Sequence, residues 1–197
     1  MPGEVRATLT LEVETSIGTA RVHLSGSGQA LLALGHGAGG GVDAADLVAA
    51  RDAAHALGWR VALVEQPWRV KGRKVAEAPP RLDRAWVEVL ADLTGSPLVV
   101  GGRSAGARVA CRTAEEVGAD AVLCFAFPLH PPNNPDRSRL PELLTPTVPV
   151  QVIQGSKDPF GVPPGAVLID GAGHSFRPQH RAQLTEVITS WLAQTLT

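Results

Sequence analysis

The chain has 197 residues, of which 44% are hydrophobic and 19% charged, a composition that suits a globular protein able to bury a core without disulfides. Its 18 basic and 19 acidic side chains leave a formal net charge of -1, which argues against nucleic acid or an anionic membrane as a partner. No apolar run reaches the roughly 18 residues of a membrane span, and residues 1–6 lack the pattern of a signal peptide. We therefore expect one cytoplasmic domain over residues 1–197.

The first predicted element is an antiparallel hairpin. Residues 5–14 alternate apolar and polar side chains, which is the period of a half-buried strand. The apolar face of this strand holds Val5, Ala7, Leu9, Leu11 and Val13. Residues 16–19 have the composition of a turn, and residues 20–24 that of the returning strand.

Strands and helices alternate from residue 30 onward. Residues 30–34 form a continuous apolar run, which is typical of a strand covered on both faces. Further strands are predicted at 59–64, 98–100, 121–126, 148–154 and 166–169. Helices are predicted at 43–57, 81–93, 105–117 and 179–196. This order predicts an α/β fold with a mostly parallel sheet and helices on both faces.

Two stretches interrupt this alternation and are predicted as loops. Residues 66–80 carry a basic cluster that we interpret as solvated: Arg69, Lys71, Arg73 and Lys74. Residues 128–149 are rich in proline and too short for a separate lid, which favours an open and shallow site. The two cysteines, Cys111 and Cys124, match no metal-ligand spacing and are expected to be buried free thiols in a reducing compartment.

The most specific motif is Gly102-Arg103-Ser104-Ala105-Gly106, a G-x-S-x-G. It stands between a short apolar strand and a predicted helix, the context in which such a serine is lifted out of the sheet as a nucleophile. Small residues on either side let the strand and helix approach closely, and the helix directs its positive end at developing negative charge. The alternative is a glycine-rich turn that the serine merely caps.

A serine nucleophile needs a base and an orienting acid. His174 and Asp158 each follow a predicted strand, in the chain order serine, acid, histidine. Both loops leave the carboxyl edge of the sheet, so we expect these side chains to meet Ser104. Asp136, in the proline-rich loop, competes for the role of the acid, whereas Asp170 lies too close to His174 in sequence to turn back onto it.

The glycine-rich segment at residues 35–41 is predicted to complete the site. We expect the backbone N–H of Ala38 to form an oxyanion hole together with that of Ala105, directly after the nucleophile. The segment also matches the dinucleotide fingerprint G-x-G-x-x-G, with Glu65 ending the next strand. That interpretation fits less well, because the helix begins only near residue 43 and the three candidate catalytic residues go unexplained.

The segments 35–40, 101–106, 127–132, 154–161 and 173–176 together resemble a family of small lidless α/β-hydrolases. The family is described as predicted hydrolases related to dienelactone hydrolases and includes the third subunit of a nuclear histone-acetyltransferase complex. The resemblance runs from about residue 30 to the C-terminus and implies an α/β-hydrolase fold without a cap domain, with the Ser104–Asp158–His174 assignment. Dienelactone hydrolases use a cysteine nucleophile where this chain has Ser104, so their activity is not carried over.

The substrate wall is predicted to include Leu129, His130 and His36, although each histidine could equally make a structural hydrogen bond. The resulting hypothesis is hydrolysis of a small carboxylic ester or thioester through an acyl-enzyme on Ser104, with no metal and no organic cofactor, by a monomer or homodimer. A non-catalytic interaction module on a hydrolase scaffold is the alternative, and a nucleotide-dependent enzyme comes third.

Overall fold

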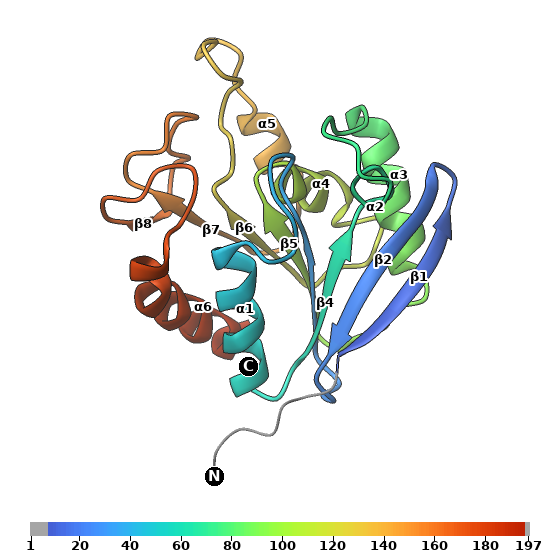
Figure 1. Cartoon of the computed structure of the whole chain (residues 1–197). Helices are drawn as coiled ribbons and strands as arrows, with labels where there is room; N and C mark the ends of the chain where they lie inside the picture. The colour runs from blue at the N-terminus through green and yellow to red at the C-terminus, as the bar shows by residue number, and fades with distance from the viewer. Residues whose placement is uncertain (1–7, 196–197) are drawn as a thin grey trace.

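The computed structural model describes residues 8–195 and contains one eight-stranded sheet (Figure 1). The strand order is β1-β2-β4-β3-β5-β6-β7-β8. The strands are β1 (Leu9–Thr15), β2 (Gly18–Ser25), β3 (Leu31–Gly35), β4 (Arg60–Glu65), β5 (Leu98–Arg103), β6 (Ala121–Phe125), β7 (Val150–Gly155) and β8 (Val167–Ile169). Neighbouring strands are parallel throughout the part β4-β3-β5-β6-β7-β8, which confirms the predicted mostly parallel sheet.

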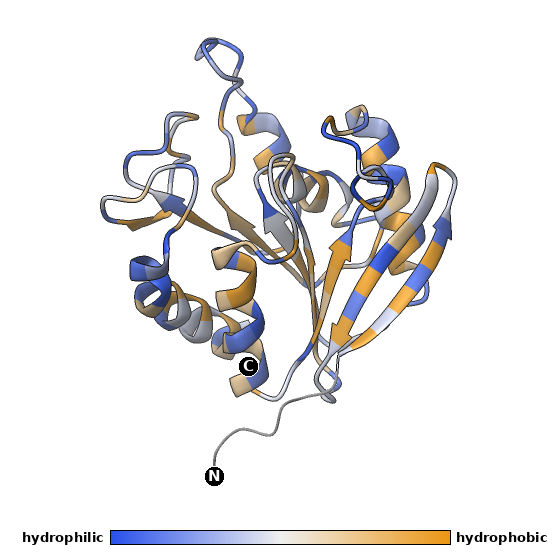
Figure 2. Cartoon of the chain, viewed as in Figure 1, coloured by the Kyte–Doolittle hydropathy of each residue, from blue (hydrophilic) through white to orange (hydrophobic). Residues whose placement is uncertain are grey.

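The N-terminal hairpin is confirmed as an antiparallel extension of that sheet. β1 pairs with β2 in the register Leu9↔Leu24, and β2 pairs with β4 in the register Val22↔Val64. Its alternating polarity is visible as alternating colours along both strands in Figure 2. Val5 and Ala7, which we assigned to the first strand, lie outside the described residues.

Helices cover both faces of the sheet, as the alternation predicts. They are α1 (Ala45–Ala56), α2 (Pro67–Val70), α3 (Pro79–Leu90), α4 (Ala105–Thr113), α5 (Leu140–Leu143) and α6 (Arg181–Thr195), the last preceded by the short 3₁₀ helix η1 (Pro178–His180). α1 and α6 pack together on one face, where Leu47 and Leu184 are buried in the same apolar cluster. α3 and α4 cover the other face, where Trp86 and Val109 are buried.

The core of each face is supplied by alternate residues of the same strands. Val99 of β5 belongs to the α1–α6 side and Val100 to the α3–α4 side. This explains why the central strands are continuous apolar runs rather than alternating ones. It also means that the sheet is fixed from both sides beneath its carboxyl edge, where the loops after β3, β5, β7 and β8 emerge.

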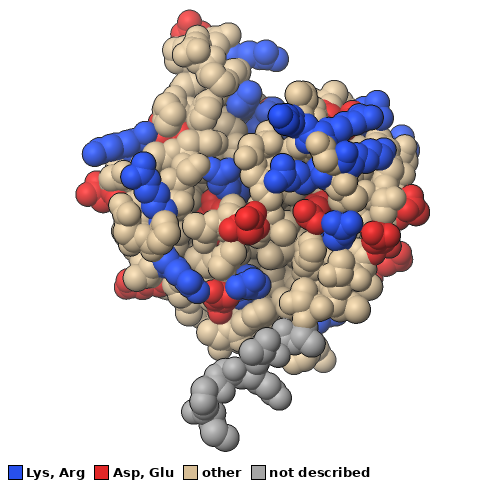
Figure 3. Space-filling view, in the orientation of Figure 1, with Lys and Arg blue, Asp and Glu red and all other residues tan. Residues whose placement is uncertain are grey.

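The structure corrects the two segments that we predicted as loops. α2 lies in residues 66–80 and α5 in residues 128–149, and each helix is four residues long with proline in its first turn. Proline is favoured at that position because the first helical N–H needs no intrahelical partner. The basic side chains around α2 are exposed as expected, and Figure 3 shows Lys and Arg gathered over the segment between α2 and α3.

The two cysteines are buried and free, as predicted, with their Sγ atoms 3.5 Å apart. Within residues 8–195 the structure contains no helix whose length and apolarity would let it cross a membrane, and no cap domain interrupts the sheet.

A matched pair of leucines tests where the fold is stabilised. Leu123 on β6 is fully buried and Leu168 on the edge strand β8 is 46% exposed. We expect Leu123→Ala to lower the free energy of unfolding by about 2–5 kcal/mol, because it leaves a cavity in the core. Leu168→Ala should change it by less than about 1 kcal/mol. Urea denaturation of both variants measures this, and equal losses would contradict the assigned positions.

Candidate active site

Ser104 lies between the last residue of β5 and the first residue of α4, as the motif predicts. Its backbone has φ 53° and ψ −107°, a conformation that non-glycine residues rarely adopt and that carries strain. The backbone N–H of Ser104 donates to the carbonyl of Phe125 at 3.0 Å, which ties the turn to the end of β6. The turn therefore holds the serine at the carboxyl edge of the sheet.

The small residues of the motif are required by the close approach of α4 to β3. A Cβ atom added to Gly102 or to Gly106 would lie 2.4 Å from the carbonyl oxygen of Gly35. Such a contact is closer than real Cβ atoms allow, so any side chain there would force α4 away from the sheet. The sequence interpretation of these glycines is confirmed.

Three side chains distant in sequence form one hydrogen-bonded series. Nε2 of His174 lies 3.0 Å from Oγ of Ser104, and Nδ1 of His174 lies 2.9 Å from Oδ2 of Asp158. With Asp158 accepting at Nδ1, the imidazole carries its proton on Nδ1 and presents a lone pair to the serine hydroxyl. This is the arrangement in which a histidine can remove a serine proton.

Asp158 is held by further donors besides His174. Its Oδ2 accepts a hydrogen bond from Nε2 of Gln154 at 2.8 Å, and its Oδ1 accepts one from the backbone N–H of Phe160 at 2.9 Å. The Asp158 side chain is fully buried, so these bonds stabilise its charge where water does not. Sequence reasoning missed Gln154, although a polar residue at the end of a buried strand was the available signal.

The competing carboxylates lie elsewhere. Both ring nitrogens of His174 are engaged by Ser104 and Asp158, which leaves no position for another acid. Asp136 is exposed in the loop before α5, and Asp170 accepts a hydrogen bond from the hydroxyl of Ser156 at 3.3 Å.

Two further contacts surround His174. The ring of Phe160 meets the imidazole edge to face, with centroids 4.3 Å apart. The Arg103 guanidinium donates to the backbone carbonyl of His174 at 2.8 Å and stands 3.0 Å from the buried Asp46. Sequence reasoning missed both Arg103 and Asp46, because each resembles an ordinary surface charge until the chain is folded.

The candidate oxyanion donors are the backbone N–H groups of Ala105 and Ala38. Ala105 is the first residue of α4, so its N–H has no partner within the helix. Ala38 is exposed in the loop after β3, and no acceptor within residues 8–195 is bonded to its N–H. Both groups are thus available to a substrate oxygen, and their joint action on it stays a prediction.

The structure places His36 inside the protein. It is 3% exposed, its Nδ1 donates to the Gly37 carbonyl at 2.9 Å, and its Nε2 accepts from the N–H of Gln66 at 3.1 Å. Burial lowers the pKa of His36, which keeps the ring neutral. With both nitrogens engaged, the ring fastens the glycine-rich loop to the end of β4 and has no nitrogen free for a substrate.

A small, mostly apolar pocket adjoins the nucleophile. Its walls are Gly35, His36, Gln66, Trp68, Ala76, Leu82, Trp86, Ala105, Gly106 and Val109. Two larger surface hollows, one between the ends of α3 and α4 and one beside α6, contain none of Ser104, Asp158 or His174. The pocket beside Ala105 is lined by none of these three side chains either, but its walls include Ala105 and Gly106, the two residues that directly follow Ser104.

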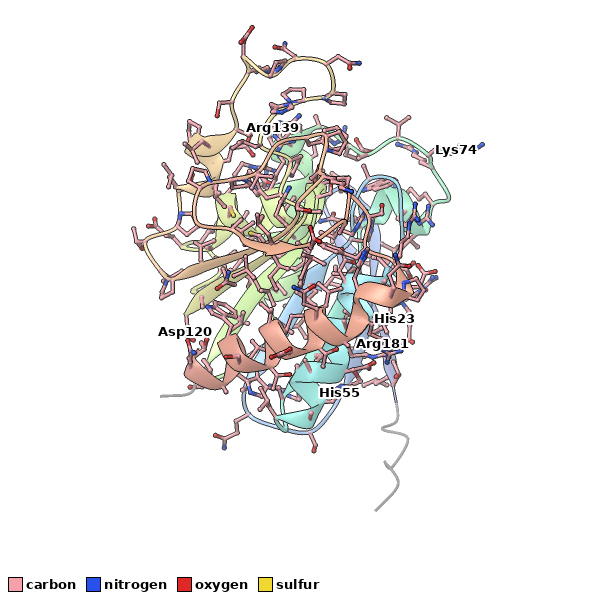
Figure 4. All side chains as sticks on the ribbon, turned by 90° about the vertical axis from the view of Figure 1, so that its left-hand side faces the viewer. His23, His55, Lys74, Asp120, Arg139 and Arg181 are labelled. Atoms are coloured by element: carbon pink, nitrogen blue, oxygen red, sulfur yellow. The ribbon has the colours of Figure 1, made fainter. Side chains whose placement is uncertain are left out.

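Leu129 and His130 pack against the segment that carries Asp158. The N–H of His130 donates to the carbonyl of Phe160 at 3.2 Å, and the N–H of Arg139 donates to the carbonyl of Leu129 at 2.7 Å. Arg139, labelled near the top of Figure 4, also donates from Nη1 to the carbonyl of His130 at 3.4 Å. Both predicted wall residues are half-exposed, and their contact with a substrate stays a prediction.

Comparison with known proteins identifies a family and a fold. A family model described as an alpha/beta hydrolase domain matches residues 28–195. The structure is similar to that of XC6422 from Xanthomonas campestris, described as an α/β serine hydrolase without lid, with a TM-score of 0.74, 17% identity and coverage of 97% of this chain and 98% of that one.

Two other solved structures have a fold similar to that of this chain. The dienelactone hydrolase from Anabaena variabilis gives a TM-score of 0.75 at 14% identity, covering 97% of this chain and 99% of its own. A hyperthermophilic esterase from the archaeon Pyrobaculum calidifontis gives 0.72 at 16% identity, covering 100% of this chain and 86% of its own. At such identities the likeness establishes the fold alone. No protein among the curated sequences matches the chain.

Two glycines test the close approach of α4 and β3. Alanine is normally favoured over glycine inside a helix by about 1 kcal/mol. Gly106→Ala should nevertheless lower the free energy of unfolding by about 1–3 kcal/mol, because its Cβ would meet the Gly35 carbonyl. Gly39→Ala, at a position with no atom within 4 Å, should leave stability within about 0.5 kcal/mol of the wild type. A Gly106→Ala protein of unchanged or higher stability would disprove the required contact.

Proposed function

The chain belongs to the alpha/beta hydrolase domain family, and we propose that it cleaves a small carboxylic ester or thioester through an acyl-enzyme on Ser104. The observation that carries the proposal is the continuous hydrogen-bonded series from Ser104 through His174 to Asp158. A strained turn, an oriented imidazole and a buried carboxylate at the edge of one sheet are the parts that nucleophilic catalysis by serine needs.

In the proposed reaction, Nε2 of His174 removes the Oγ proton as Ser104 attacks the substrate carbonyl carbon. The carbonyl oxygen becomes an oxyanion, which the N–H groups of Ala38 and Ala105 stabilise. The imidazolium then returns the proton to the departing alcohol or thiol, leaving the acyl group on Oγ. A water molecule, deprotonated by the same nitrogen, releases the acid and restores the serine.

Asp158 has two tasks in this scheme. It holds the proton on Nδ1, so that Nε2 stays available as the base, and it stabilises the imidazolium that forms when the serine proton moves. The bonds from Gln154 and Phe160 keep the carboxylate aimed at the ring. A misdirected carboxylate would allow the other tautomer, in which Nε2 cannot accept a proton.

The surroundings of the serine support a small substrate. The pocket beside Ala105 is lined by Trp68 and Trp86 and has little open space, which argues against a bulky acyl group at this position. The segment between β6 and β7 contains only the short helix α5, and we infer that the leaving group extends into solvent. The buried thiols of Cys111 and Cys124, which lie close together without a disulfide, support a reducing, cytoplasmic location.

The activity is tested by covalent labelling together with turnover. We expect a fluorophosphonate probe to modify Ser104 in the folded protein, and p-nitrophenyl acetate to be hydrolysed. Ser104→Ala should lose both properties while keeping its fold, because the nucleophile is the only group removed. Folded wild-type protein that neither reacts with the probe nor hydrolyses the ester would favour the non-catalytic interaction module instead.

The acid is tested by two equivalent substitutions. Asp158→Asn should reduce kcat about 10⁴-fold with the fold intact, since the amide favours the wrong tautomer of His174. Asp136→Asn, at an exposed loop position, should leave kcat unchanged. Steady-state kinetics of the two proteins decides the matter. Near-normal turnover in Asp158→Asn combined with loss in Asp136→Asn would reverse the assignment.

A further inference from the structure

A buried ion pair lies directly behind the Ser104–His174 contact. Arg103, the residue before the nucleophile, is 9% exposed, and Asp46 in the first turn of α1 is 1% exposed. Nε of Arg103 stands 3.0 Å from Oδ2 of Asp46, while the other carboxylate oxygen accepts the N–H of Leu47 at 2.9 Å. None of these groups takes part in the reaction described above.

Besides Asp46 in α1, the same guanidinium reaches two loops at the carboxyl edge. Its Nη2 donates to the backbone carbonyl of His174 at 2.8 Å and to the hydroxyl of Ser175 at 2.7 Å. Its Nη1 faces Gly37, where an added Cβ would lie 3.0 Å away. The side chain therefore contacts the loop after β3 and the loop after β8, while its own backbone adjoins the nucleophile.

The backbone around His174 has little other anchorage. The N–H groups of Ser156 and Lys157 donate to the carbonyls of Ile169 and Ala172, at 3.0 Å and 2.8 Å. Beyond that point, no backbone–backbone hydrogen bond within the described chain reaches residues 173–176. The hydrogen bonds from Arg103 to His174 and Ser175 are thus what holds the backbone of the loop that carries the imidazole.

Burying this pair is costly for stability. A buried ion pair is often no more stabilising than well-packed apolar residues of the same volume, because both charges lose their hydration. Burial raises the pKa of the Asp46 carboxyl, and the charge on Arg103 opposes that rise. Oδ2 of Asp46 has no directed hydrogen bond within residues 8–195, so charge is what attaches the two side chains.

We propose that Arg103 is a positioning residue that sets the placement of His174 against Ser104, and that Asp46 fixes the Arg103 side chain in that orientation. The expected loss of kcat rests on the proposed function, whereas the expected loosening of the loop around His174 does not. Because Arg103 and Ser104 are adjacent in sequence, the guanidinium joins the base to the nucleophile by a short, rigid route. A base held this way needs no lid to keep it in place.

Arg103→Met removes the donors and the charge while keeping a long side chain. A misplacement of a catalytic group by about 1 Å costs roughly 10²-fold in rate, so we expect kcat to fall by about that factor with KM nearly unchanged. Arg103→Lys keeps the charge beside Asp46 but loses the forked geometry, and should restore part of the lost kcat.

Arg108→Met is the matched control. Arg108 lies in the first turns of α4 and is also partly buried in an ion pair, 2.7 Å from Glu142, but it makes no bond to the His174 loop. Its replacement should lower stability to a similar degree without changing kcat. If lower stability were the cause of a lower kcat, kcat would therefore fall in both Arg103→Met and Arg108→Met.

The deciding experiment combines hydrogen–deuterium exchange with kinetics on p-nitrophenyl acetate. We expect Arg103→Met to accelerate exchange in residues 171–177 while α6 and β5 stay protected, together with the loss in kcat. Unchanged exchange and unchanged kcat in Arg103→Met would overturn the inference, as would an equal loss of kcat in Arg108→Met.

If Arg103→Met does not fold, Arg103→Lys and Ser175→Ala are measured in the same way. Wild-type kcat together with wild-type exchange in both variants would overturn the inference. Wild-type protein that lacks turnover refutes the proposed function, and the exchange data then decide the role of Arg103 alone.

Discussion

The candidate site depends on one close approach, that of α4 to the end of β3. Gly102 and Gly106 let the helix come so near the Gly35 carbonyl that no side chain fits between them, and between these two glycines Ser104 adopts its strained conformation. The strain is tolerable because cores on both faces of the sheet hold the turn from below. The position of this strained serine determines where His174, Asp158 and the N–H of Ala105 must lie for the site to function.

The other parts of the site are held around the serine by buried polar groups rather than by apolar packing. Gln154 directs Asp158, and His36 fastens the glycine-rich loop to β4. Arg103 connects the serine turn to the backbone of His174. Buried polar groups demand specific partners, so such a network defines one arrangement where apolar contacts would permit several. Residues 8–195 contain no cap domain that could order these loops, which makes this internal ordering the more necessary.

Much of this was predictable from the sequence, for identifiable reasons. The runs at β3, β5 and β6 are apolar because both faces are covered, and the chain order of the strands places the loops of Ser104, Asp158 and His174 on one edge. The helices α2 and α5 were missed because one proline-led turn looks like loop in a linear reading. Arg103 and Asp46 were missed because their directions are set by packing between distant segments, which periodicity does not encode. The same packing gives both ring nitrogens of His36 a backbone partner, the structural alternative that the sequence had left open.

The central claim is that acyl transfer passes through Ser104. Its most direct test is a rapid-quench reaction with p-nitrophenyl acetate, followed by mass analysis of the intact protein and its peptides. Acyl transfer through Ser104 predicts one acetyl group on the peptide that contains Ser104, and a burst of nitrophenolate equivalent to the protein present when deacylation is the slower step. Acetylation at another residue only, or turnover that persists in Ser104→Ala, would contradict it.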